Sequence, residues 1–147
     1  MAVNRDFAGR TFPASEPYEV SRVKISEFAV AIGDKNPLFH DRAAAQAAGH
    51  RDVIAPPTFA IVISMAGSGA ALADPALGLN YAMVVHGEQR FSYSRPFTAG
   101  DVVSGQVTIT DIRDAGRNVM ITTSTEIRTV AGEHVCTAMS TIVERGA

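Results

Sequence analysis

The sequence predicts an α+β fold in which an antiparallel β-sheet of about five strands wraps around one long helix. Two observations carry this prediction. The second half of the chain alternates apolar and polar residues with a period of two, as half-buried strands do. The first half contains a run from Thr58 to Ala73 that is apolar on nearly every side of a helix, and such a helix is usually buried all round. A chain of 147 residues is long enough to bury one core, so we expect residues 1–147 to form a single domain.

Two shorter helices are expected before the long one. Apolar residues fall three, four and seven positions after Ile25, which predicts a helix from Lys24 to Ile32. Gly33 then suits the left-handed conformation that commonly ends a helix. Asp41 is a favourable N-cap for a second, short helix. The loop between these helices is therefore held at both of its ends.

The strands are expected where β-branched residues alternate with polar ones between turn-forming segments. Turns are predicted at Asp114–Gly116 and Ala131–Glu133, each of which contains a glycine. The expected strands are Val84–Tyr93, Val103–Thr110, Val119–Ile127 and Val135–Val143, with a short one near Tyr18–Val20.

Composition excludes several classes of protein. The 13 Lys and Arg residues against 15 Asp and Glu residues give a net charge of −2, and no basic run is present, so neither nucleic acid nor an anionic membrane is an expected partner. The segment Met1–Pro17 carries charges where a signal peptide needs an apolar core. Prolines and serines interrupt Val53–Ala73, which makes it a poor membrane span. The single cysteine, Cys136, suits a reducing compartment, and we expect a cytoplasmic protein.

Acid–base chemistry has few candidates in this sequence. Asp34, Asn36 and His40 lie within seven residues on a loop ordered by Pro37. A carboxylate and an imidazole so placed could share a water molecule, which one orients and the other deprotonates. The alternative, which the residues by themselves favour, is that Asp34 and Asn36 cap the backbone of a turn. His86 could line a ligand pocket or make a hydrogen bond in the core. No spacing typical of a metal site or of a bound cofactor is present, so none is expected.

Five short motifs occur in order along the chain: Gly33–Asp41 (GDKNPLFHD), Val53–Phe59 (VIAPPTF), Val85–Phe91 (VHGEQRF), Arg95-Pro96 and Ala99–Asp101. Together they resemble one known family, the MaoC-like hydratase/dehydratases, over about residues 7–143. The resemblance is narrower to the actinobacterial proteins related to the A-type subunit of heterodimeric (3R)-hydroxyacyl-ACP dehydratases. It implies a hot-dog fold, in which an antiparallel sheet wraps a central helix, and dimers whose sheets join edge to edge.

Two positions depart from the pattern of the catalytic members. Their loop reads Asp-x-Asn-Pro-Leu/Ile-His-x-Asp, so the family's Asp and Asn correspond to Asp34 and Asn36, but Phe39 occupies the position of the catalytic His and His40 lies one place later. Phenylalanine cannot accept a proton. In those relatives a glycine N–H at the start of the central helix supports the oxyanion. Pro57 stands there and has no N–H, and losing one such donor typically lowers turnover about 10² to 10³-fold.

The leading hypothesis is therefore that this chain is one subunit of an (R)-3-hydroxyacyl thioester dehydratase, a hydro-lyase. It would bind the acyl chain of an acyl-ACP or acyl-CoA while a partner MaoC-like subunit supplies the catalytic pair. One alternative is a complete homodimeric enzyme that uses Asp34 and His40. Another is a non-catalytic acyl-binding or scaffolding protein. The resemblance implies substrate-binding roles for Asn36, Phe39, Pro56, Pro57, Thr58, Phe59 and His86.

Overall fold

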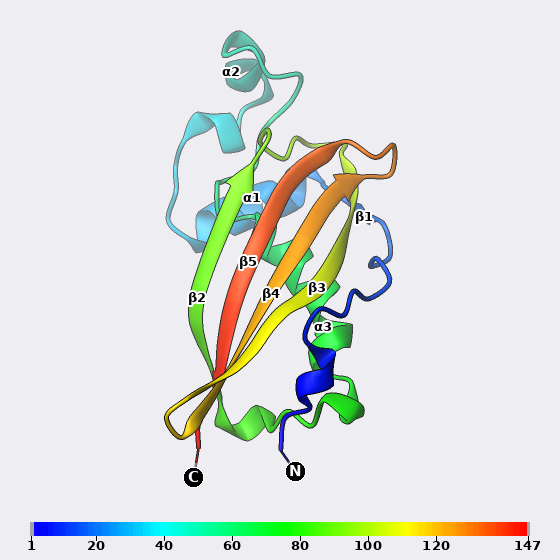
Figure 1. Cartoon of the computed structure of the whole chain (residues 1–147). Helices are drawn as coiled ribbons and strands as arrows, with labels where there is room; N and C mark the ends of the chain where they lie inside the picture. Colours follow the sequence, from blue (N-terminus) through cyan, green and yellow to red (C-terminus); the bar gives the residue numbers. More distant parts are fainter. Residues whose placement is uncertain (1, 147) are drawn as a thin grey trace.

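One antiparallel sheet of five strands organises the chain (Figure 1). The computed structural model describes residues 2–146. The strand order is β1-β3-β4-β5-β2, so the short β1 forms one edge and β2 forms the other. The strands are β1 (Tyr18–Glu19), β2 (Val84–Tyr93), β3 (Val102–Ala115), β4 (Asn118–Thr129) and β5 (His134–Glu144), and the helices are α1 (Arg22–Ala31), α2 (Arg42–Ala47) and α3 (Ala60–Leu72).

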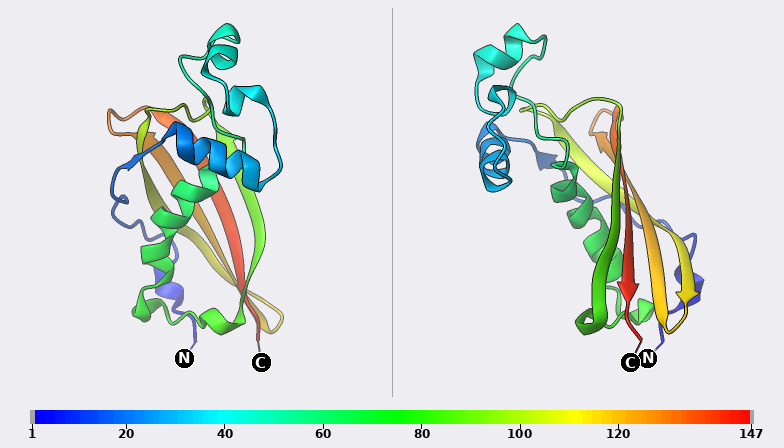
Figure 2. Two further views of the ribbon diagram at one scale, coloured as in Figure 1. Left: turned by 180° about the vertical axis from the view of Figure 1, so that it is seen from behind. Right: turned by 90° about the vertical axis from the view of Figure 1, so that its left-hand side faces the viewer.

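Helix α3 lies along one face of the sheet, and α1 crosses α3 near the first turns of α3 (Figure 2). The helix can approach the sheet closely because both surfaces carry glycine. A Cβ atom at Gly67 would lie only 3.1 Å from the backbone oxygen of Gly105 on β3. This arrangement is the α+β architecture that the residue patterns predict and the hot-dog fold that the resemblance implies, and the five expected strands are confirmed.

Helix α1 begins two residues earlier than predicted, at Arg22, but its C-terminal end and the start of α2 follow the prediction closely. The N–H of Gly33 donates to Val30, and the N–H of Asp34 donates to Ala29, while Gly33 has a φ of +74°. These two bonds form a Schellman motif, which satisfies the last carbonyls of the helix. Asp41 accepts hydrogen bonds from the N–H groups of the first turn of α2, as an N-cap does.

The central helix differs from the prediction in one important way. It begins two residues later than expected, at Ala60, and it is buried on one side only. Met65 is 65% exposed, and Ala66, Gly69 and Ala70 are exposed as well. The prediction that this helix is buried all round is therefore wrong for the single chain, because the sheet covers only the face that contacts it.

Candidate functional site

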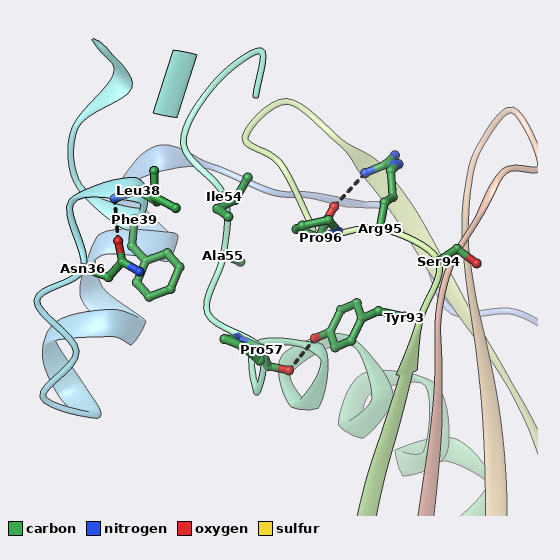
Figure 3. Close-up of a pocket in the computed structure, with 10 residues that line it drawn as sticks. All are labelled: Asn36, Leu38, Phe39, Ile54, Ala55, Pro57, Tyr93, Ser94, Arg95 and Pro96. Carbon is green, nitrogen blue, oxygen red and sulfur yellow. Dashed lines mark hydrogen bonds between the residues drawn. The ribbon is translucent and has the colours of Figure 1, made fainter. Parts of the chain in front are cut away.

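A pocket of about 500 Å³ lies between the loop after α1, the segment that leads into α3, and the end of β2 (Figure 3). Residues from segments 36–39, 54–57 and 93–96 line it. Backbone hydrogen bonds join these walls to one another: the N–H of Ile54 donates to Leu38 at 3.1 Å, and the N–H of Ala55 donates to Phe97 at 2.8 Å. The pocket is thus held by paired backbone and does not depend on side chains alone.

Arg95 in the pocket wall is held by two carboxylates. Its guanidinium donates two bonds to Asp101, at 2.7 and 3.0 Å, and two to Glu133, at 2.7 and 3.2 Å. Asp101 also accepts from Arg51 and from the N–H of Thr98. Burial of the Asp101 carboxyl opposes ionisation, but the hydrogen bonds from Arg95, Thr98 and Arg51 hold its pKa below the usual value. The Arg95 guanidinium is therefore held in the pocket wall by two carboxylates that balance its charge.

The loop after α1 uses its polar side chains as turn caps. A carboxylate oxygen of Asp34 accepts from the N–H of Asn36 at 3.0 Å, and the side-chain oxygen of Asn36 accepts from the N–H of Leu38 at 3.0 Å. Since that oxygen is an acceptor, the amide nitrogen of Asn36 is the atom left to face the pocket (Figure 3). The capping interpretation of these two residues accounts for their observed contacts.

His40 makes its contacts with α1 and with the backbone of its own loop. Its Nδ1 atom lies 3.0 Å from the Ser26 hydroxyl on α1, and its Nε2 atom lies 3.1 Å from the backbone oxygen of Asp34. The imidazole is therefore near the Asp34 backbone, and neither Asp34 nor His40 lines the pocket. Phe39 lines it instead and is 5% exposed. An apolar ring thus occupies the place where the resemblance leads one to expect an imidazole.

Pro57 forms the floor of the pocket just before α3. It offers no N–H, and its carbonyl oxygen accepts a hydrogen bond of 2.6 Å from the hydroxyl of Tyr93 (Figure 3). Burial raises the pKa of the Tyr93 hydroxyl above its ordinary value, so it remains a donor at neutral pH. Position 57 therefore contributes a carbonyl that is already hydrogen-bonded and no N–H group.

Three other residues with implied binding roles lie outside this lining. Pro56 is buried and Thr58 is exposed, and neither contributes to the wall. Phe59 is fully buried, with ring centroids 5.4 Å from Phe28 and 5.8 Å from Phe97. Its contacts are those of a core residue that anchors the helix start.

His86 lies in a different hollow, between α3 and β2. Its Nε2 atom is 3.1 Å from both the Ser140 hydroxyl and the backbone oxygen of Glu88. Of the residues expected to bind substrate, the structure therefore brings Asn36, Phe39 and Pro57 together and places His86 apart.

Sequence reasoning missed Tyr93 and Arg95 as pocket residues. The alternation of β2 was a usable signal, because it directs Phe91 and Tyr93 to the face that α3 covers. Among residues 2–146, no helix has the length and apolar character needed to cross a membrane. The same residues contain no cluster of three or more side chains suited to holding a metal ion.

Comparison with known proteins places the chain in a family. A family model described as "FAS1-like, dehydratase domain region" matches residues 6–138. A UPF0336 protein of Thermobifida fusca is 58% identical over 99% of this chain and 96% of its own length. A UPF0336 protein of Saccharopolyspora erythraea is 51% identical over 99% of this chain and 94% of its own length.

Solved structures agree with this assignment. A MaoC-like dehydratase is 32% identical with a TM-score of 0.87; the match covers 95% of this chain but only 42% of that longer chain. The ChsH1-ChsH2 complex of Mycobacterium tuberculosis matches at 25% identity and a TM-score of 0.76, over 94% of this chain and 90% of that one. The HadBC (3R-hydroxyacyl-ACP dehydratase) complex of the same organism shares the fold. It matches at 24% identity and a TM-score of 0.81, over 94% of this chain and 97% of that one. The chain therefore belongs to the MaoC-like dehydratase family, among its actinobacterial UPF0336 members.

Proposed function

We propose that this protein is the substrate-binding subunit of an (R)-3-hydroxyacyl thioester dehydratase, and that a partner subunit of the same fold supplies the catalytic Asp/His pair. The reaction removes a proton from C2 and the hydroxyl group from C3 as water, and leaves a C2=C3 double bond. The observation that carries the proposal is the pocket in which Phe39 and Pro57 replace an imidazole and a backbone donor.

The lining of the pocket supports binding over catalysis. Most of its walls are apolar, from Leu38, Phe39, Ile54, Ala55 and Pro57, while Asn36, Ser94 and Arg95 contribute polar groups. An apolar pocket with a few convergent polar groups is typical of a ligand site. No imidazole or carboxylate lines the described walls, so a bound acyl thioester would meet no proton acceptor there.

Two exposed features support a partner of the same fold. Strand β2 is a ten-residue edge strand, and its outer side pairs with none of the described strands. Proteins normally cover such an edge, because its backbone N–H and C=O groups are unpaired. The uncovered face of α3 carries Met65, Ala66, Gly69 and Ala70. The ChsH1-ChsH2 structure is a complex, and the MaoC-like dehydratase that matches at 32% identity is more than twice as long as this chain. The complex and the longer chain both fit a site that a second unit of the same fold completes.

A copurification experiment tests the proposal. The tagged chain is isolated from its native host, and the captured complex and the chain alone are assayed with 3-hydroxyacyl thioesters and, in the reverse direction, with crotonyl and longer enoyl thioesters of CoA and ACP. We expect turnover in the complex and none in the chain alone.

Variants distinguish this proposal from self-sufficient catalysis. Asp34→Ala and His40→Ala are expected to leave turnover of the complex within a few-fold of wild type, like the control Glu16→Ala in the exposed loop before β1. Ordinary turnover by the chain alone, abolished by Asp34→Ala, would instead establish the homodimeric enzyme. Thioester binding without turnover in any captured complex would establish a non-catalytic acyl-binding protein.

A further inference from the structure

A second hollow, of about 110 Å³, lies between α3 and the face of the sheet that α3 covers. We call it the hydroxyl cleft, because Ser64 and Ser68 of α3, Thr123 and Thr125 of β4, and Ser140 of β5 line it. The interior face of a sheet beneath a helix is normally filled by aliphatic side chains. In β4 the inward row reads Ile121, Thr123, Thr125, Ile127, so two hydroxyl groups interrupt an aliphatic row.

The two threonines are almost completely buried, yet their hydroxyls have no protein partner. Thr123 is 3% exposed and Thr125 is 1% exposed. Among residues 2–146 neither hydroxyl makes a hydrogen bond, although every fully enclosed side-chain oxygen there has a partner. It follows that both hydroxyls retain contact with the open cleft. The methyl carbon of Thr125 packs between α3 and β3, 3.2 Å from where a Cβ at Gly67 would be and 3.1 Å from where a Cβ at Gly105 would be.

Hydroxyls at this depth can pair only with what occupies the cleft. An occupant without polar atoms would leave both of them without a partner, which is unfavourable, whereas valine has nearly the same shape and no hydroxyl. The rest of the lining comes from the exposed Met65, from His86 and Gln89 of the edge strand, and from the aliphatic side chains of Ile61, Leu72, Ala138 and Ile142. The cleft therefore borders the face of α3 and the edge strand on which we expect the partner.

We propose that the hydroxyl cleft binds an oxygen-bearing part of the acyl chain beyond C3, so that the preferred substrates are oxygenated acyl thioesters rather than plain saturated ones. This inference rests on the proposed function. Hydroxyl or keto oxygens on the chain would pair with Thr123 and Thr125, which a saturated chain would leave unsatisfied. Removing the partner of a buried polar group costs more than removing both members of the pair, so the cleft discriminates against a purely aliphatic chain.

The test compares three pantetheine thioesters of equal chain length: octanoyl, 5-hydroxyoctanoyl and 7-hydroxyoctanoyl. Their dissociation constants are measured by calorimetry on the full chain in the assembly in which it purifies from its host. We expect at least one hydroxylated thioester to bind about three- to tenfold more tightly than the octanoyl compound, as one hydrogen bond contributes. The double variant Thr123→Val/Thr125→Val should reduce this preference to less than about twofold.

The matched control is Ser124→Ala, which removes a hydroxyl from the same strand on the opposite face of the sheet. It should preserve the preference, and thermal unfolding should show that both variants fold. Equal affinity for all three thioesters, or a preference that survives the double variant, would overturn the inference and leave the proposed acyl binding intact. If none of the three binds, the proposed function fails together with it.

Discussion

Tyr93 shows how one hydrogen bond can define the floor of a pocket. Its hydroxyl reaches the carbonyl of Pro57, which precedes the first turn of α3. Its ring packs edge-on against Phe97, with centroids 5.9 Å apart. The side chain thus joins the end of β2 to the start of the central helix.

We therefore expect Tyr93→Phe to lower the free energy of unfolding by about 1 kcal/mol, because the ring contacts remain and one hydrogen bond is lost. Urea denaturation measures the change. Tyr81→Phe serves as the control, since Tyr81 is 57% exposed and donates no hydrogen bond to another described residue. An equal loss in both variants would mean that the Pro57 contact contributes nothing specific.

Asp52 is the residue through which acid should destabilise the fold. It accepts from the Arg22 guanidinium at 2.6 Å and from the N–H of Val53 at 2.7 Å, and it lies 3.4 Å from Arg42. The hydrogen bonds from Arg22, stronger than the opposing effect of burial, lower the pKa of Asp52 to about 2. Since an aspartate in an unfolded chain titrates near about 4, its stabilisation is complete above that pH and is lost as the pH falls from about 4 to about 2.

Asp52→Asn should accordingly be less stable than wild type at pH 7, and the difference should shrink as the pH approaches 2. Thermal unfolding from pH 7 down to pH 2 measures both proteins. Glu16→Gln, at an exposed carboxylate without an ion pair among the described residues, should leave the acid profile unchanged. A constant gap between Asp52→Asn and wild type at every pH would contradict the assignment.

At the scale of one element, two glycines of α3 provide a matched pair. Gly67 faces the sheet, where a Cβ would lie 3.1 Å from the oxygen of Gly105 and 3.2 Å from the methyl of Thr125. Gly69, one half-turn further, faces away and would meet no atom within 4 Å. Both substitutions by alanine favour the helix by about 1 kcal/mol, so their difference reports packing.

Gly67→Ala should lower the free energy of unfolding, because crowding in a packed interface costs about 1–3 kcal/mol. Gly69→Ala should raise it by about 0.5–1 kcal/mol. Chemical denaturation of the two variants at several protein concentrations distinguishes folding from association. If Gly67→Ala proved as stable as Gly69→Ala, the close approach of α3 to β3 would be incorrect.

For the whole molecule, the uncovered side of α3 and the free edge of β2 are the surfaces that matter. Under the proposed function they are covered by a second subunit, and a charge placed there would be buried without a partner. We expect Met65→Asp to abolish assembly while the single chain still folds, as measured by light scattering and circular dichroism.

Val30→Asp is the control for this prediction, because Val30 is 69% exposed on α1 and lies outside the proposed contact. It should leave the mass of the assembly unchanged. A wild-type assembly that persists in Met65→Asp would mean that the exposed face of α3 is not the interface.

Short-range patterns of the sequence were sufficient to predict most elements. The period of two along Val119–Ile127 identifies both β4 and its inward row. The apolar spacing after Ile25, followed by Gly33, identifies α1 and its end. These predictions succeed because strand alternation, helix periodicity and capping depend on residues close together in the chain.

The site was determined partly by sequence and partly by tertiary contacts. That Phe39 and Pro57 lack the proton acceptor and the N–H is a property of the side chains themselves, so the sequence by itself determined it. The direction of His40 toward Ser26, the bond from Tyr93 to Pro57 and the exposure of one side of α3 were decided only by the tertiary structure. The contacts of His40 and Tyr93 join residues far apart in the chain, and the exposure of α3 depends on how much of a helix one sheet can cover. Periodicity and capping depend on neighbouring residues, so they cannot predict these features.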